Sequence, residues 1–264
     1  MHCARIFYEM TVPCVFLEYR QKEISFIKKA IHAMGMPYYA CDARHLADIS
    51  QQKGEILIVS VNNTYLFPPK TLACKNITII NYHNSLLPRH RGMHAEAWAI
   101  YDNDEETGIT WHMVDSGIDT GDVIIQRKIP IADTMTSLSL LAEQTKSALN
   151  ALRESLPDIL HGGNIQAFPQ ARSSRTEMHR KGDIPNGGEL HSDWPDEKIW
   201  SFLRAMDYGG ARTLGTPRVH VSGKWYSWRK YQKIRDTGTF PVQDNKKTLL
   251  LKNTFILYDI FEIA

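Results

Sequence analysis

The residues best suited to chemistry follow a strongly apolar stretch of the chain. Asn81 and His83 stand two positions apart at the end of an expected strand, Ile77–His83. Alternate residues of a strand point to the same face, so these side chains lie roughly 7 Å apart and one ligand can touch both. The carboxamide of Asn81 is a neutral hydrogen-bond donor, and the imidazole of His83 exchanges protons near neutral pH.

A second polar segment, Val114–Asp122, follows the expected strand Thr107–Val114 and contains two glycines and three carboxylates. Ligands of open α/β sheets bind at the carboxyl ends of strands, where both segments begin. Asp119 is therefore expected at the same edge as the first segment. Asp115 and Asp122 fit well as turn residues, and for them that structural role is favoured.

The order and spacing of these residues resemble a known motif. Asp119 follows Asn81 by 38 residues and lies in a Gly-rich loop. The motif positions are filled by Asn81, His83, Ser85, Leu87, Pro88 and Asp119. This pattern resembles the folate-dependent formyltransferase family, which includes methionyl-tRNA formyltransferase, glycinamide ribonucleotide transformylase and sugar-nucleotide N-formyltransferases.

The resemblance implies an enzyme that moves a formyl group from N10-formyl-tetrahydrofolate, its co-substrate, to an amine. The reaction passes through a tetrahedral oxyanion, which the amide of Asn81 can stabilise. His83 would donate to the same oxygen or carry the proton, and Asp119 would orient it or organise a water. Loss of one oxyanion donor typically costs on the order of 10²–10³ in rate.

The resemblance also implies which residues bind the two substrates. The pterin ring would lie against the main chain of two segments, represented by Asn63, Tyr65, Leu66, Val114, Asp115 and Gly117. Expected contacts to the acceptor are Ser85, Arg91 and His94. No metal is expected, because His83, His90, His94 and His112 lack metal-binding spacing and have no cysteine near them.

Three functions remain open from the sequence. The leading one is N-formylation of a primary amine on a small or carrier-bound acceptor: an amino sugar nucleotide, an amino acid or an aminoacyl group. The second is hydrolysis of formyl-tetrahydrofolate, and the third is a non-catalytic remnant that binds folate or a partner. The insertion with which methionyl-tRNA formyltransferase enters its tRNA is not visible, so a tRNA is a less favoured acceptor.

Alternating strand and helix patterns up to about Pro169 predict an α/β fold, a Rossmann-like, mostly parallel sheet with helices on both faces. The expected strands are Cys14–Tyr19, Tyr38–Cys41, Glu55–Val61, Ile77–His83, Thr107–Val114 and Val123–Ile131. Helices are expected over Lys22–Met34, over His94–Tyr101, and from the N-cap Thr136 to Pro157 or to Gly162–Gly163. Members of the resembling family open with a strand, whereas here either Cys3–Met10 is the first helix or Ala4–Tyr8 is a stub of that strand.

The composition changes over residues 170–188, which predicts a linker between a catalytic domain, 1–169, and a small domain, 189–264. The small domain should begin with a helix after Trp194–Pro195 and continue as an antiparallel, OB-like β-barrel. Its expected strands are Val219–Val221, Trp225–Tyr231, Phe240–Gln243, Thr248–Lys252 and Phe255–Ile263. Basic and aromatic residues between Arg212 and Arg235 leave nucleic acid as a less favoured partner.

Composition sets the remaining bounds. The chain has 264 residues, a formal net charge of +2 and four dispersed cysteines, which fits a reducing cytoplasm and argues against a disulfide framework. No apolar run approaches the roughly 20 residues of a membrane helix, so no membrane partner is expected. The acceptor and the oligomeric state are not identified, and a homo-oligomer is left open.

Overall fold

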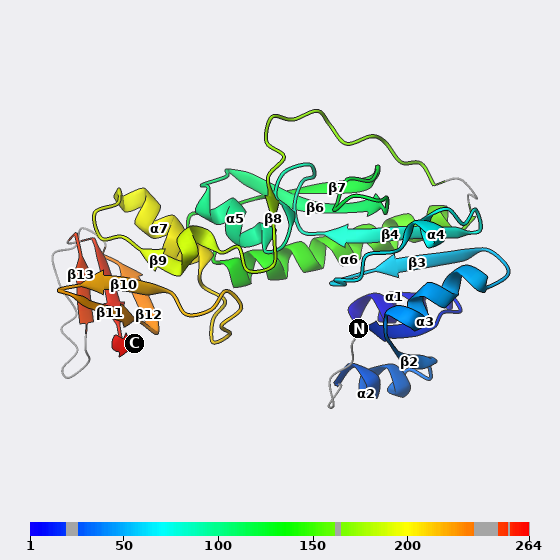
Figure 1. Cartoon of the computed structure of the whole chain (residues 1–264), viewed down its shortest axis with the longest axis horizontal. Coiled ribbons are helices and arrows are strands. Elements are labelled where there is room, and N and C mark those ends of the chain that lie inside the picture. Colours follow the sequence, from blue (N-terminus) through cyan, green and yellow to red (C-terminus); the bar gives the residue numbers. More distant parts are fainter. Residues whose placement is uncertain (20–25, 162–164, 235–247, 253, 264) are drawn as a thin grey trace. The chain divides into compact units, whose positions relative to one another are not determined.

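The computed structural model describes residues 1–19, 26–161, 165–234, 248–252 and 254–263 (Figure 1). These residues form two compact units that alternate along the chain. Unit 1 comprises residues 1–91, 108–128 and 144–177, and unit 2 comprises residues 92–107, 129–143 and 178–264. The division into domains 1–169 and 189–264 stays a prediction.

Unit 1 begins with a helix. Its first elements are α1 (His2–Glu9), β1 (Phe16–Tyr19), α2 (Phe26–Ala33), β2 (Tyr38–Cys41), α3 (Ala43–Asp48) and the 3-10 helix η1 (Ile49–Gln51). Helix α1 buries Ala4, Ile6 and Phe7. The chain therefore starts with the first helix rather than with a strand stub. Of the helix predicted over Lys22–Met34, residues 22–25 lie outside the described residues.

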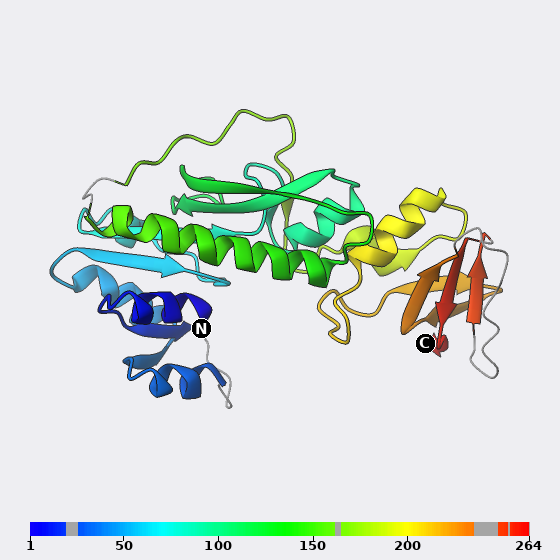
Figure 2. The same cartoon turned by 180° about the vertical axis from the view of Figure 1, so that it is seen from behind.

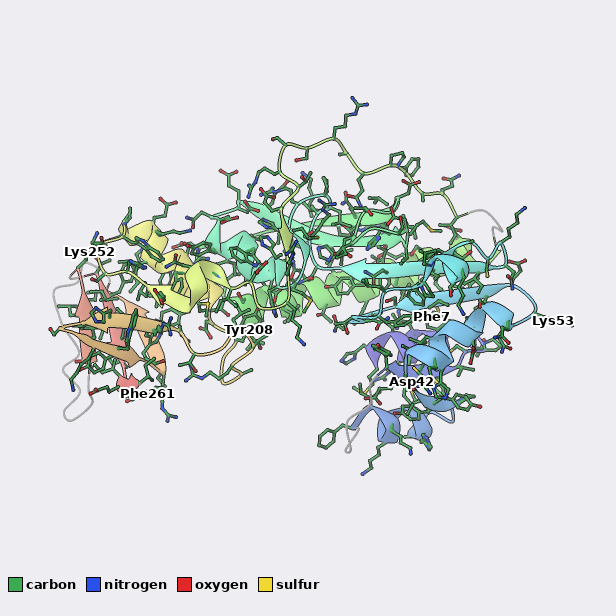
Figure 3. All side chains as sticks on the ribbon, viewed as in Figure 1. Phe7, Asp42, Lys53, Tyr208, Lys252 and Phe261 are labelled. Carbon is green, nitrogen blue, oxygen red and sulfur yellow. The ribbon has the colours of Figure 1, made fainter. Side chains whose placement is uncertain are left out.

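Strands β1 and β2 pair in parallel as a separate two-stranded sheet, with Phe16 beside Tyr38. The short helix α3 was not predicted. Asp42 caps it by accepting hydrogen bonds from the main-chain N–H groups of Arg44 and His45, and is labelled in Figure 3. Such a cap satisfies two of the donors that a helix start leaves without partners.

The main sheet has four strands in the order β3-β4-β6-β7. They are β3 (Ile56–Ser60), β4 (Ile77–His83), β6 (Glu106–Met113) and β7 (Val123–Pro130). β3 and β4 are parallel, as predicted, but β4 and β6 are antiparallel. The fold is thus α/β with parallel strands, and the sheet is mixed because β6 returns against the strand that carries Asn81.

Short elements connect these strands, and one long helix covers the sheet. They are α4 (Pro69–Leu72), β5 (Arg91–Gly92), α5 (Ala95–Tyr101) and α6 (Ser137–His161). α6 runs along one face of the sheet (Figure 2), where Ala148 accepts a hydrogen bond at 3.0 Å from the indole N–H of Trp111 on β6. The helix continues through Pro157, so the first of the two predicted ends, Pro157, is wrong.

Unit 2 combines helices with two small sheets. Its later elements are β8 (Met178–His179), η2 (Pro185–Gly188), β9 (Glu189–Leu190), α7 (Asp196–Ala205), β10 (Arg218–Val221), β11 (Lys224–Ser227), β12 (Lys230–Lys233), β13 (Thr248–Leu251), β14 (Phe255–Tyr258) and β15 (Phe261–Ile263). One sheet has the order β15-β11-β10-β9 and the other β12-β14-β13. The predicted hairpin at Ser222–Gly223 joins β10 to β11 in antiparallel pairing.

The C-terminal strands differ from the prediction in two ways. Each of the ranges Trp225–Tyr231 and Phe255–Ile263 is divided into two strands that belong to different sheets, and Asp259 at the second break has a positive φ of 52°. Phe240–Gln243 lies outside the described residues. The described residues from Glu189 to Ile263 contain two sheets and no closed barrel, so the OB-like barrel stays a prediction.

The core of unit 2 is built from α5, α7 and the sheets. Its fully buried members include Ile199, Phe202, Val219 and Phe255. Tyr208 donates to the Glu96 carboxylate, and both residues are buried. No helix of the described residues is long and apolar enough to cross a membrane.

Candidate active site

Strand β4 places Asn81 and His83 on one face, next to both neighbouring strands. Asn81 is paired with Ser60 of β3 and with His112 of β6. His83 is paired with Thr110, two residues before His112. Because side chains alternate along a strand, the polar pairs Asn81–His112 and His83–Thr110 share one face of the sheet.

The loop after β6 folds back on itself and brings Asp119 to β4. Met113 donates from its main-chain N–H to the carbonyl of Asp122 at 2.8 Å, which closes the loop. Inside it, the Asp115 carboxylate accepts from the Thr120 hydroxyl and from the N–H of Gly117. A Cβ at Gly121 would collide with the carbonyl of Met113, so glycine is required for the return of the chain.

Gln170 fixes the tip of this loop from a distant part of the sequence. Its Nε2 donates to the carbonyl of Asp119 at 2.8 Å and to that of Gly121 at 2.9 Å. Asp119 itself has a positive φ of 52°, an uncommon conformation for a residue other than glycine. The sequence placed Gln170 at the start of a linker, and no motif marks it.

The three motif side chains lie together in unit 1. Nδ2 of Asn81 is 3.4 Å from Oδ1 of Asp119, and Nδ1 of His83 is 3.4 Å from Oδ2 of the same carboxylate. The side chain of His83 is 5% exposed and that of Asp119 is 12% exposed. Water screens charges weakly at such a position, so the carboxylate acts strongly on both neighbours.

His83 uses both of its ring nitrogens within the protein. Nε2 lies 2.9 Å from the carbonyl of His90, which can only accept, so Nε2 carries a proton. Nδ1 then faces the Asp119 carboxylate, and this contact is attractive only with one proton between the two groups. His83 and Asp119 therefore form a pair that holds one transferable proton. Both ring nitrogens of His83 have partners within the protein.

His112 is a third neighbour of the carboxylate that the motif did not identify. Its Nδ1 lies 2.8 Å from the carbonyl of Met113, and its Nε2 lies 3.2 Å from Nδ2 of Asn81 and 3.4 Å from Oδ1 of Asp119. The signal for it was present in the sequence as two polar residues, Thr110 and His112, at alternate positions of an apolar strand.

The residues expected to hold the pterin ring belong to the turn after β3 and to the loop after β6. Asn63 accepts at 3.0 Å from the N–H of Tyr65, which fixes the turn after β3. The ring of Tyr65 packs against those of Tyr19 and Phe67, and burial raises its pKa, while Leu66 is 71% exposed. Val114, Asp115 and Gly117 belong to the loop that carries Asp119, where Val114 donates to the carbonyl of Ile79.

The residues expected to contact the acceptor are not grouped in this way. Ser85 is fully buried and donates to the carbonyl of Arg89 at 2.6 Å, so its hydroxyl holds the turn after β4. Arg91 donates from its guanidinium to the carbonyl of Thr176 in unit 1. His94 belongs to unit 2, where it precedes α5 with a φ of 59°.

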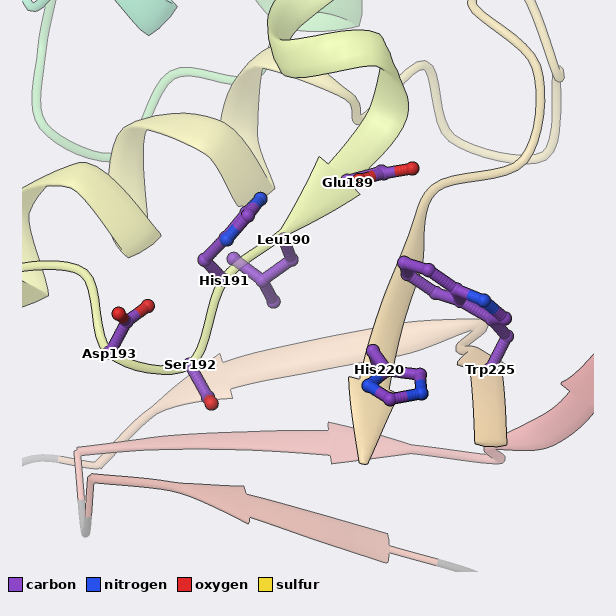
Figure 4. A pocket seen from close by; sticks show the side chains of 7 residues that line it. All are labelled: Glu189, Leu190, His191, Ser192, Asp193, His220 and Trp225. Atoms are coloured by element: carbon purple, nitrogen blue, oxygen red, sulfur yellow. The ribbon is translucent and has the colours of Figure 1, made fainter. Parts of the chain in front are cut away.

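A pocket of about 350 Å³ lies elsewhere, within unit 2. Figure 4 shows Ser192 pointing away from His191 and Asp193, and His220 lying against the ring of Trp225. These side chains do not converge, and none belongs to the motif. Among the described residues no group of three or more His, Cys, Asp and Glu side chains is arranged to hold a metal ion.

Comparison with known proteins agrees with the motif. Residues 30–156 match the family model described as formyl transferase. GDP-perosamine N-formyltransferase of Brucella melitensis is 31% identical over 150 residues, which are 57% of this chain and 56% of that protein. Methionyl-tRNA formyltransferase of Synechococcus sp. is 33% identical over 169 residues, which are 62% of this chain and 50% of that protein. The chain thus spans about half the length of the curated relatives it matches.

Solved structures share the fold. The sugar 3N-formyl transferase WlaRD, solved in the presence of dTDP and 5-N-formyl-THF, has a TM-score of 0.72 at 15% identity and covers 97% of this chain and 92% of its own. A 4-N formyltransferase from Francisella tularensis has a TM-score of 0.69 at 20% identity and covers 83% of this chain and 88% of its own. The resemblance to formyltransferases inferred from the motif is confirmed.

Proposed function

We propose that this protein, whose residues 30–156 match the formyl transferase family model, transfers the formyl group of N10-formyl-tetrahydrofolate to a primary amine. The observation that carries the proposal is the convergence of one carboxamide, one imidazole and one carboxylate within 3.4 Å contacts at the end of β4. These are the groups that an acyl transfer to nitrogen requires: an oxyanion donor and a proton carrier.

Asn81 supplies the oxyanion donor. The amine nitrogen attacks the formyl carbon, a C–N bond forms, and the carbonyl oxygen becomes an oxyanion that accepts a hydrogen bond from Nδ2. A neutral amide stabilises this charge without adding an ion to a mostly buried site. The paired strands β3 and β6 hold Asn81 on both sides, so the donor is fixed before the substrate arrives.

The His83–Asp119 pair moves the proton. The attacking amine becomes positively charged and must lose a proton, while the departing folate nitrogen N10 must gain one when its bond to the formyl carbon breaks. The pair gives its shared proton to N10, and the proton that the amine loses restores the pair. Proton balance over the cycle needs no metal and no redox partner.

The folate is assigned to the two turns beside the pair. The main-chain groups of Asn63–Leu66 and of Val114–Gly117 follow β3 and β6, the two strands that flank Asn81. The exposed side chain of Leu66 offers an apolar surface to a ring, and the N–H and carbonyl groups of such turns recognise a pterin edge.

For the acceptor we favour the amine of an amino sugar nucleotide. The relative named GDP-perosamine N-formyltransferase supports this choice, and the relative named methionyl-tRNA formyltransferase makes an aminoacyl-tRNA the alternative acceptor. Within unit 1, Arg91 remains a candidate acceptor contact, whereas the buried hydroxyl of Ser85 holds the turn that precedes it. An amino acid or a carrier-bound aminoacyl group, and a homo-oligomeric state, remain compatible with the proposal.

A panel assay tests the function. The protein is incubated with N10-formyl-tetrahydrofolate and amino sugar nucleotides, amino acids or no acceptor, and the release of tetrahydrofolate is followed. Release that depends on an amino sugar nucleotide supports the proposal. Release of formate without an amine would identify a hydrolase, and folate binding with no turnover on any acceptor would identify a non-catalytic remnant.

A further inference from the structure

His112 is a buried polar side chain that touches two members of the proposed catalytic group. Its side chain is 3% exposed, and strand pairing places it directly beside Asn81. A buried imidazole needs partners for both ring nitrogens, and the identities of those partners determine which nitrogen carries the proton.

The main chain determines the tautomer of His112. Nδ1 lies 2.8 Å from the carbonyl oxygen of Met113, which can only accept, so Nδ1 is the protonated nitrogen. Nε2 lies 3.2 Å from Nδ2 of Asn81, an atom that can only donate. Nε2 therefore carries a lone pair and His112 is neutral, and the N–H of Asn81 between Nε2 and Oδ1 of Asp119 keeps the lone pair from facing the carboxylate directly.

The same contact orients the carboxamide of Asn81. If the amide were reversed, its oxygen would face the lone pair of His112 and the carboxylate of Asp119, and both contacts would be repulsive. These two contacts distinguish the two ends of the amide. The neutral imidazole and the carboxylate together select the orientation in which Nδ2 lies next to Asp119.

This orientation leaves one N–H of Asn81 for the substrate. The distances of 3.2 Å from Nδ2 to Nε2, 3.4 Å from Nδ2 to Oδ1 of Asp119, and 3.4 Å from Nε2 to Oδ1 form a nearly equilateral triangle. Seen from Nδ2, the two acceptors are about 60° apart, half of the roughly 120° between the two N–H bonds of an amide. One N–H can serve both acceptors, and the second points away from them.

We infer that His112 is a positioning residue, which holds the Asn81 carboxamide through the lone pair on Nε2 so that its second N–H is directed at the developing oxyanion. The effect of His112 on catalysis depends on the proposed function, because an oxyanion forms only if formyl transfer occurs. The tautomer and the amide orientation that it requires are properties of the free protein.

Two substitutions separate positioning from a structural role. In His112→Asn, the shorter amide can still donate to Met113 but does not reach the position of Nε2, so kcat should fall roughly 10-fold to 100-fold with little change in the KM for folate. In His112→Gln, the longer side chain can place its oxygen where Nε2 lay, and at least part of the lost kcat should return. Equal kcat in both variants and the wild type would overturn the inference, and so would equal losses in both.

A measurement on the wild-type protein gives an answer that does not depend on activity. NMR of protein labelled with ¹⁵N-histidine reports which nitrogen of His112 is protonated, with the His112→Gln spectrum serving to assign the signal. A neutral ring protonated at Nδ1 supports the inference. A proton on Nε2, or a doubly protonated ring, overturns it even if formyl transfer is observed, and absence of turnover with a ring protonated at Nδ1 would count against the proposed function alone.

Discussion

The side-chain amide of Gln170 donates to the main-chain carbonyl of Asp119 across 51 positions of sequence, at 2.8 Å. This contact and the parallel one to Gly121 tie the carboxylate-bearing loop to a segment that the sequence treats as a linker. The position of the Asp119 carboxylate therefore depends on a residue that never touches it directly.

Removal of this tie should reduce catalysis more than stability. In Gln170→Ala we expect kcat for formyl transfer to fall roughly 10-fold to 100-fold, because a small displacement of a reacting group is sufficient for such a loss. Gln166→Ala, an exposed glutamine of the same segment, is the matched control. Equal kcat in the two variants would show that Gln170 does not position Asp119.

Gly121 should not tolerate a side chain. A Cβ there would collide with the carbonyl of Met113, so Gly121→Ala must displace the loop and is expected to cost about 1–3 kcal/mol of unfolding free energy. Gly210→Ala is the control, because a Cβ at Gly210 meets open space. Chemical denaturation of both variants measures the difference, and equal stabilities would contradict the loop geometry.

The carboxylate of Asp119 should be required as a charge. Asp119→Asn keeps the shape of the side chain but removes its capacity to take a proton, and we expect kcat to fall at least roughly 10²-fold. Asp122→Asn makes the same change at an exposed position of the same loop and should retain most of the activity. Steady-state kinetics of the pair test this, and a comparable loss in both would point to the net charge of the loop instead.

Two tyrosines, the buried Tyr208 and the half-buried Tyr231, should make unit 2 sensitive to alkaline pH. Burial, and then the carboxylate of Asp207, raise the pKa of Tyr231, which donates to Asp207 at 2.8 Å. The pKa of Tyr208 is raised by burial and by Glu96. In the unfolded chain tyrosine loses its proton near pH 10, so above about pH 10 only the unfolded state releases protons and the unfolding free energy falls with rising pH.

Tyr231→Phe tests this dependence. The contribution of one such tyrosine is constant below about pH 10 and declines by up to about 1.4 kcal/mol per pH unit above it. The variant should lose stability less steeply than the wild type in this range. Tyr39→Phe, at an exposed tyrosine, serves as the control, and identical slopes for Tyr231→Phe and wild type would contradict the assignment.

Much of unit 1 could be predicted because its signals are local. The strands of unit 1 are present within two residues of the expected ends, since apolar runs such as Ile77–Ile80 and the turn residues after them determine where strands begin and stop. The motif residues could be selected because Asn81 and His83 share a strand face. The antiparallel direction of β6 could not be predicted, because the apolar pattern of a strand does not indicate which way the strand runs.

The remaining features depend on contacts that are distant in sequence. The role of Gln170 requires a hydrogen bond to a loop 51 residues earlier. His112 was considered only as a metal ligand, because its position beside Asn81 depends on the register of β4 and β6. In the C-terminal region, the chain passes from one sheet to the other at residues 228–229 and again at residues 259–260. The sequence pattern is continuous across both positions, so it does not indicate that a strand ends there.

The most direct test of the central claim follows the formyl carbon itself. N10-[¹³C]formyl-tetrahydrofolate is incubated with an amino sugar nucleotide and either wild-type protein or Asn81→Ala, and the products are identified by mass spectrometry. We predict a ¹³C-formylated sugar nucleotide with the wild type, and a rate on the order of 10²–10³ lower with the variant. Labelled formate as the product of the wild type, or equal rates of sugar formylation in both proteins, would contradict a formyl-transfer centre built on Asn81, His83 and Asp119.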